Sequence, residues 1–258
     1  MRLTALLMTV LSSGALAEDF VRLPGQPAFA SILRYAESDG KVSIAPFQLM
    51  TRPVTNAQFL AFVVKHPEWR RGAAPAIFAE PRYLEHWSGP LLLGDSAEPE
   101  QPVTRVSWFA ARAYCEASNA RLPTWSEWEY AAAADATRAD ARQDLAWRDR
   151  ILRWYAKPSN AAIARVGQGV PDLHGVHDLH GLIWEWVDDY AAMLVSADNR
   201  NQADPDLLKF CGAGALDTND RENYAVLMRI AMLSALEGHD TTGNLGFRCA
   251  RDSSEDSP

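Results

Sequence analysis

The chain has few cysteines, no cluster of basic residues and no long apolar run after its N-terminus. Its three cysteines are Cys115, Cys211 and Cys249, and an odd number leaves at least one thiol outside any disulfide within the chain. Lys and Arg total 25 against 33 Asp and Glu, so the formal net charge is -8. Because no basic patch is present, neither nucleic acid nor an anionic membrane is an expected partner. No later segment is long and apolar enough to predict a transmembrane helix, so no such anchor is expected.

The first seventeen residues have the pattern of a secretory signal peptide. Arg2 supplies the positive charge, LTALLMTVL is apolar but too short to span a bilayer, and residues 15–17 (ALA) form a small-residue cleavage site. We therefore expect residues 1–17 to be removed and the mature protein, starting at Glu18, to be periplasmic. Export would place the cysteines where disulfides persist.

The rest of the chain is expected to form one domain. Apolar residues make up 48% of the sequence, and its nine tryptophans are ample for a core. Neither a repeat nor a linker divides it. We therefore predict a single domain over residues 18–252, followed by a polar tail, residues 253–258.

Periodicity and capping residues predict several short elements. Alternating stretches before residue 50, such as residues 41–47 (KVSIAPF), are typical of short strands. Helices are expected after three capping residues, Thr55, Ser107 and Thr124, the last forming a capping box with Glu127.

Two parts of the chain are expected to contain little regular structure. These are residues 70–102, which form a long loop rich in Pro and Gly, and the sequence beyond residue 140. In this second part only residues 224–236 (YAVLMRIAMLSAL) have a convincing helical period. The expected fold class is α+β.

Several segments carry recognisable motifs. In chain order they are TRPVTNAQF at 51–59, PVTRVSW at 102–108 with AYC at 113–115, RLPTWSEWEYA at 121–131, GLIWEW at 181–186, and GNLGFRC at 243–249. Over residues 20 to 252 this order and spacing resemble the formylglycine-generating enzyme domain, also called the sulfatase-modifying factor domain. The resemblance implies a complex, loop-rich single-domain fold related to C-type lectins.

The resemblance also bears on the cysteines. True formylglycine-generating enzymes bind copper through two cysteines a few residues apart, but the matching segment, residues 210–218 (FCGAGALDT), holds only Cys211. Since paired thiolates hold the copper, formylglycine formation is not expected. The family pattern pairs Cys115 with Cys249. Cys211 is then the odd thiol, either a buried small hydrophobe or a reactive, copper-binding group.

Three of the six histidines precede the WEW motif, at His174, His177 and His180. Their three-residue spacing in a turn-rich segment does not make metal ligands converge. The iron-dependent branch of the resembled family uses His-x-x-x-His-x-Glu, a run absent from this sequence. We therefore favour hydrogen-bonded or surface histidines over a metal site, and His180 is the best functional candidate of the three.

Calcium is the second cofactor question. Members of the resembled family often hold structural calcium with an Asn and the Glu of a Gly-Asn-Val-Trp-Glu-Trp motif among its ligands. Here Leu182 replaces that Asn, Glu185 is kept, and Asn160 lies where another ligand would be. Two interpretations stay open: Asn160 and Glu185 hold calcium, or Glu185 accepts hydrogen bonds from buried donors between its tryptophans.

Finer details, such as DLHGLIWEWVDDY and FCGAGALD, most resemble the exported NirV-type proteins found with copper nitrite reductases, and are also similar to a pyoverdine-maturation oxidase. Three hypotheses follow. The first is an oxidoreductase-like maturation factor that acts on an exported protein or peptide through Cys211, His180 and Arg229, in a groove bordered by Trp184 or Trp186. The second is a copper-handling accessory protein for a partner such as nitrite reductase. The third is a non-catalytic binding module.

Overall fold

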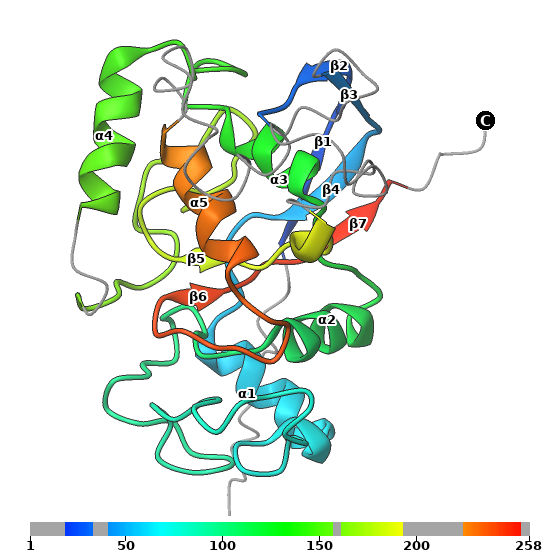
Figure 1. Ribbon diagram of the computed structural model, residues 1–258, viewed down its shortest axis with the longest axis vertical. Helices are drawn as coiled ribbons and strands as arrows, with labels where there is room; N and C mark the ends of the chain where they lie inside the picture. Colours follow the sequence, from blue (N-terminus) through cyan, green and yellow to red (C-terminus); the bar gives the residue numbers. More distant parts are fainter. Residues whose placement is uncertain (1–18, 33–40, 157–160, 193–223, 254–258) are drawn as a thin grey trace, which may run out of the picture.

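The computed structural model describes residues 19–32, 41–156, 161–192 and 224–253 (Figure 1). The elements are β1 (Phe20–Leu23), β2 (Gln26–Ala30), β3 (Lys41–Ile44), β4 (Phe47–Met50), α1 (Asn56–Lys65), η1 (Pro67–Trp69), α2 (Trp108–Ala117), α3 (Trp125–Ala132), α4 (Leu145–Tyr155), β5 (Trp184–Glu185), η2 (Tyr190–Ala192), α5 (Tyr224–Ser234), β6 (Leu245–Gly246) and β7 (Ala250–Asp252). This is a mixed α and β domain with short elements and long loops, as the sequence predicts. None of the helices in these ranges is long and apolar enough to cross a membrane.

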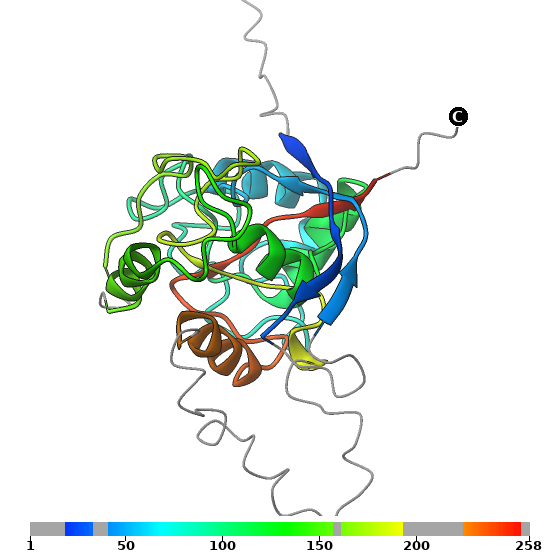
Figure 2. The same ribbon diagram turned by 90° about the horizontal axis from the view of Figure 1, so that it is seen from above.

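The main sheet joins the two ends of the described chain. Strands β1, β4 and β7 form an antiparallel sheet in the order β1-β4-β7, and Leu49 of β4 lies opposite Val21 on one side and Ala250 on the other. Strands β2 and β3 form a separate antiparallel pair. Figure 2 shows the main sheet along one side of the molecule and α4 on the opposite side.

The predicted capping residues begin their helices. The side chains of Thr55, Ser107 and Thr124 each accept a hydrogen bond from a backbone N–H in the first turn of α1, α2 and α3. Glu127 completes the capping box of α3, because its carboxylate accepts from the Thr124 N–H at 2.8 Å. The late apolar segment is helical as predicted, although α5 ends at Ser234.

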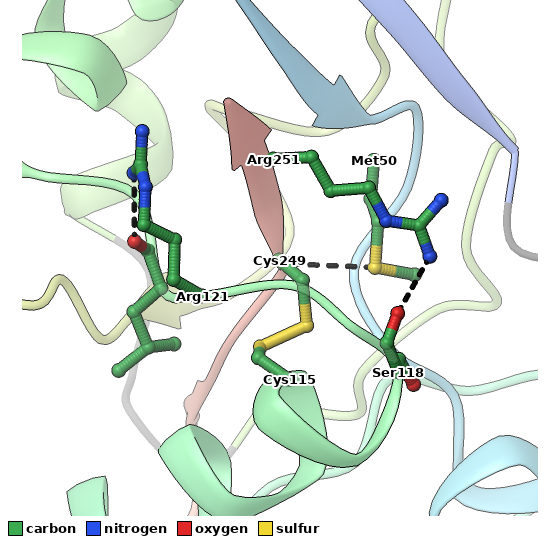
Figure 3. The surroundings of a disulfide bond; sticks show 7 residues. Met50, Cys115, Ser118, Arg121, Cys249 and Arg251 are labelled. Carbon is green, nitrogen blue, oxygen red and sulfur yellow. Dashed lines mark hydrogen bonds between the residues drawn. A yellow bond between two sulfur atoms is a disulfide. The ribbon is translucent and has the colours of Figure 1, made fainter. Parts of the chain in front are cut away.

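The expected disulfide is formed and ties α2 to the residue that precedes β7 (Figure 3). Cys115 and Cys249 are both fully buried, with their Cα atoms 5.5 Å apart. The chain on either side is also fastened: Ala250 and Arg121 exchange backbone hydrogen bonds of 2.7 and 2.9 Å, and Met50 Sδ accepts from the Cys249 N–H at 3.3 Å. The cross-link therefore lies in the packed interior.

Helix α4 corrects the expectation that regular structure fades beyond residue 140. Asp144 caps the helix, since its Oδ1 accepts from the Trp147 N–H at 2.7 Å. Trp147, Ile151 and Tyr155 follow at four-residue spacing, and with Ala141 they form a small apolar cluster separate from the main core. The helical period was present, but charged residues between these positions concealed it.

Candidate functional site

A buried cluster of charged and aromatic side chains lies where α3, β5, α5 and the segment between β6 and β7 meet. Glu185 Oε1 accepts from Arg248 Nη2 at 2.8 Å, and its Oε2 accepts from Arg248 Nε and from Trp128 Nε1, each at 2.9 Å. These three side chains are at most 1% exposed. Both carboxylate oxygens of Glu185 are therefore occupied by donors from the chain itself.

This arrangement does not fit a calcium ligand at Glu185. A divalent cation there would lie beside the buried positive charge of Arg248, and the repulsion between the like charges would oppose its binding. Asn160, the other candidate, lies outside the described residues. Within the described residues no three His, Cys, Asp or Glu side chains gather as a metal-binding group. Glu185 accepts hydrogen bonds from buried donors, as the second interpretation expects, and calcium binding stays a prediction.

Arg229 of α5 lies inside this cluster and not at a surface groove. Its guanidinium centre is 3.5 Å from the centre of the Trp128 ring, and its Nη2 donates to the backbone carbonyl of Glu185. Only 1% of the residue is exposed, and burial lowers its pKa to about 10. In this position the charge of Arg229 supports the packing of Trp128 and β5, and it does not face solvent where a substrate carboxylate would bind.

His180 also lies against Trp128, beneath α4. Its ring meets the Trp128 and Trp147 rings edge to face, with centroids 5.7 and 5.3 Å apart. Nε2 lies 2.8 Å from the carbonyl oxygen of Ala132, while the buried Nδ1 has no partner among the described residues. Burial lowers the pKa of His180 to about 4, so the ring is neutral near pH 7. His177 is likewise hydrogen-bonded, through Nδ1 to the Gly169 carbonyl at 2.9 Å, and the favoured hydrogen-bonded interpretation is confirmed for both.

The two tryptophans that flank Glu185 differ in exposure. Trp186 is fully buried and its Nε1 donates to the Val106 carbonyl at 2.9 Å, so it is a core residue. Trp184 is half-buried and packs on Trp154 and Tyr155 of α4, with ring centroids 5.8 and 4.9 Å apart. Of this pair, only Trp184 has surface from which it could contact a ligand.

Cys211 lies outside the described residues. Its distance from His180 is therefore untested, and their joint role stays a prediction. The structure does bring His180, Arg229 and Glu185 around Trp128, but as parts of one packed interior. We infer that these three side chains stabilise the fold of the domain.

A cavity of about 520 Å³ lies between α4 and the body of the domain. It is lined by residues 134–137 after α3, by one face of α4 that includes Trp147, and by the segment from residue 169 to His180. Asp172 lines it as well: its Oδ1 accepts from the His174 and Val176 N–H groups at 2.8 Å, and its buried Oδ2 has no partner among the described residues. Trp147 was not among the predicted site residues because α4 was not expected, and Asp172 was not because no motif marks its loop.

Fold, motifs and comparison agree on the class of protein. Residues 12–253 match the family model of the sulfatase-modifying factor enzyme 1-like domain, and the chain belongs to that family. The formylglycine-generating enzyme of Streptomyces coelicolor is 29% identical over 284 aligned residues, covering 90% of this chain and 88% of that protein. The "inactive C-alpha-formylglycine-generating enzyme 2" of Mus musculus is 27% identical over 246, covering 81% and 76%.

Two solved structures also match over most of their length. The crystal structure of CarF has a TM-score of 0.48 at 16% identity and covers 92% of this chain and 99% of that one. The structure of PvdO from Pseudomonas aeruginosa has a TM-score of 0.45 at 17% identity and covers 90% and 94%.

Proposed function

We propose that this chain is an exported accessory or maturation factor of the sulfatase-modifying factor family that does not form formylglycine. The observation that supports this most directly is the number of free thiols. Cys115 and Cys249 are joined in a disulfide, so Cys211 is the one cysteine of the sequence left over. A copper site made of two thiolates cannot be assembled from a single thiol.

The other candidate residues make their contacts within the protein, and this supports the same proposal. Arg229 is buried against Trp128, Glu185 is paired with Arg248, and His180 donates to the Ala132 carbonyl. Relatives from Mus musculus and Bos taurus, at 27% and 28% identity, are named as inactive formylglycine-generating enzymes, so the family framework exists without that activity. A non-catalytic binding module on a lectin-like scaffold is the second candidate, and the same internal contacts favour it.

The proposed partner is an exported protein or peptide in the periplasm, and a copper nitrite reductase is the specific candidate. The resemblance of the segments around residues 178–190 and 210–217 to NirV-type proteins supports this partner. Copper handling would fall to Cys211, because thiolate is a preferred ligand of Cu(I) and imidazole is also tolerated. The alternative in which the protein is an enzyme is an oxidase of the pyoverdine-maturation type.

A peptide-conversion assay tests the proposal that the protein does not form formylglycine. The mature protein, loaded with copper under air, is incubated with a Cys-x-Pro-x-Arg peptide, with the Streptomyces coelicolor relative as positive control. We expect the mass of the peptide cysteine to stay unchanged in our protein while the relative converts it. Formylglycine formed by our protein would show that one thiol is sufficient.

The test of the accessory role is metal content together with partner binding. We expect the native protein to retain Cu(I), Cys211→Ser to lose it, and Met228→Leu, which removes an exposed thioether, to retain it. Calorimetric titration with copper-free nitrite reductase should then show binding. Binding without any retained copper would favour the non-catalytic module. If the protein neither binds the partner nor retains copper, the accessory role is rejected.

A further inference from the structure

The cavity beneath α4 takes no part in the proposed function, and its walls are chemically distinctive. Helix α4 packs on the domain through Trp147 and Ile151, which belong to a separate small apolar cluster. With Leu179, these side chains give the cavity an apolar wall. Its volume of about 520 Å³ is within the range of small-ligand sites.

His180 supplies the cavity with a hydrogen-bond acceptor. The Ala132 carbonyl can only accept, so the proton of the neutral ring must be on Nε2, which lies 2.8 Å from that oxygen. Nδ1 then carries a lone pair, and it is buried with no partner among the described residues. A buried acceptor without a donor is costly, so a ligand that donates to it would be favoured.

Asp172, another residue of the cavity lining, supplies a second acceptor. Its Oδ1 is satisfied by the His174 and Val176 N–H groups, but its Oδ2 is buried with no partner in the described part of the chain. Burial raises the pKa of Asp172, which means that the free carboxylate is under-solvated. A cation nearby would stabilise it.

The remaining charges at the cavity favour the same ligand. Asp178 and Asp135 also line it, while Arg150 is the one Lys or Arg among the described residues of its lining. Arg150 is exposed on α4, and its charge contributes to the lowered pKa of His180 after burial and Arg229. Asp135 is neutralised by Arg138, to which it is bonded through Oδ2. Among the described lining residues, the three acidic side chains outnumber the one basic side chain.

We propose that this cavity binds an alkylammonium group, such as a lysine side chain of another polypeptide or a free primary amine. An ammonium has three donors and no acceptor, which suits the unpartnered atoms of His180 and Asp172. Its methylene stem would pack on Trp147 and Ile151. Val170, on the cavity wall and 83% exposed, and Leu173, 51% exposed, add apolar surface for residues next to a bound lysine. The inference does not depend on the proposed function, since it concerns binding alone.

The experiment uses the full mature protein and three probes with a similar apolar chain of four or five carbons: pentylammonium, pentanol and pentanoate. Binding is measured by calorimetry and by the NMR shift of the Trp147 indole N–H, assigned with Trp147→Phe. We expect saturable binding of pentylammonium, binding of pentanol weaker by about tenfold, and no binding of pentanoate. Equal binding of pentanoate, or no saturable binding of pentylammonium, would overturn the proposal.

Variants locate the site. Asp172→Asn should weaken pentylammonium binding by about tenfold or more, because it removes the charge at similar volume. Asp149→Asn, at an exposed position of α4 that does not line the cavity, should bind as the wild type does. Ala136→Trp fills the cavity from an exposed loop position and should abolish binding without altering a charge. Wild-type binding by either folded Asp172→Asn or folded Ala136→Trp would reject this site.

A final arm distinguishes the two sources of the amine. The peptide acetyl-Leu-Lys-Leu-amide is compared with pentylamine at the same pH. Tighter binding of the peptide, lost in Ala136→Trp, indicates a lysine side chain of a polypeptide. Equal or weaker binding of the peptide indicates a free amine.

Discussion

Glu185 and Arg248 form a fully buried ion pair with two points of contact, 2.8 Å between Oε1 and Nη2 and 2.9 Å between Oε2 and Nε. Arg248 also donates to the carbonyls of Met50 and His177, at 3.1 and 2.8 Å. One side chain therefore fastens β4, the segment before β5, and β5 itself. Because loops contribute so much of this domain, buried polar links of this kind replace long strands as connectors.

Breaking the ion pair should be strongly destabilising. Glu185→Gln or Arg248→Met leaves a buried charge without its counter-ion, and we expect the free energy of unfolding to fall by about 3–5 kcal/mol. The double variant should lose less than the sum of the two. Glu116→Gln, which breaks the exposed pair with Arg112, is the control and should change stability by less than about 1 kcal/mol. Urea titration measures all four, and additive losses would contradict a direct link.

The same variant decides whether Glu185 holds calcium. Since both of its oxygens already accept hydrogen bonds from the chain, the effect of calcium on the melting temperature should be the same in wild type and in Glu185→Gln. Melting is followed by circular dichroism in chelator and in excess calcium. A calcium-dependent rise that disappears in Glu185→Gln would restore the calcium-site interpretation.

Burial of His180 should make stability depend on pH. Its pKa of about 4 in the folded protein is below the 6.5 of a free imidazole, so the unfolded chain binds the proton first as pH falls. The stabilisation is complete above about pH 6.5 and is lost between 6.5 and 4, by about 3 kcal/mol. His180→Gln should show a shallower decline over this window. The pKa of His86 is also lowered to about 4, and His86 affects the pH dependence of both proteins equally. The difference between the two stability curves therefore isolates the effect of His180. Parallel curves would show that His180 is not buried as a neutral ring.

Loss of the disulfide should lower the free energy of unfolding, and Cys211 should be a free thiol in the wild type. Cys115 and Cys249 are 134 residues apart, and the chain-entropy model gives roughly 4–5 kcal/mol for a loop of this length. The double variant Cys115→Ser, Cys249→Ser should lose about this amount in urea unfolding. In the wild type, mass mapping of unreduced peptides should find Cys211 free. A bridge from Cys211 to either partner would contradict the thiol count on which the proposed function depends.

Gly246 should tolerate no side chain. A Cβ at this position would lie 2.2 Å from the Val103 carbonyl oxygen and 2.8 Å from Ile183 Cδ1, in the parallel pairing of β6 with β5. Val103 is fully buried and its N–H donates to the Val54 carbonyl, so its oxygen has little room to move aside, and Gly246→Ala should cost about 3 kcal/mol or more. Gly89→Ala, whose Cβ would make only an ordinary 3.6 Å contact with Leu92, is the control. Equal stability of the two variants would show that the backbone adapts.

The sequence alone determined the local elements and the family. Thr55, Ser107 and Thr124 could be identified as helix starts because capping depends on side chains within three residues of each other. The disulfide followed from the motifs around Cys115 and Cys249, since the family pattern places the partners. Helix α4 could have been found from Asp144 and the four-residue spacing of Trp147 and Ile151, which are also local signals.

Only the tertiary structure decided what the candidate site residues do. Arg229, Glu185 and His180 could be identified by type, but type does not reveal burial or partners. Glu185 meets Arg248 across 63 residues, and His180 meets Ala132 across 48. The cavity beneath α4 likewise depends on the packing of a helix against two loops. Contacts of this range arise from how the whole chain folds back on itself, and no periodicity within a single segment encodes them.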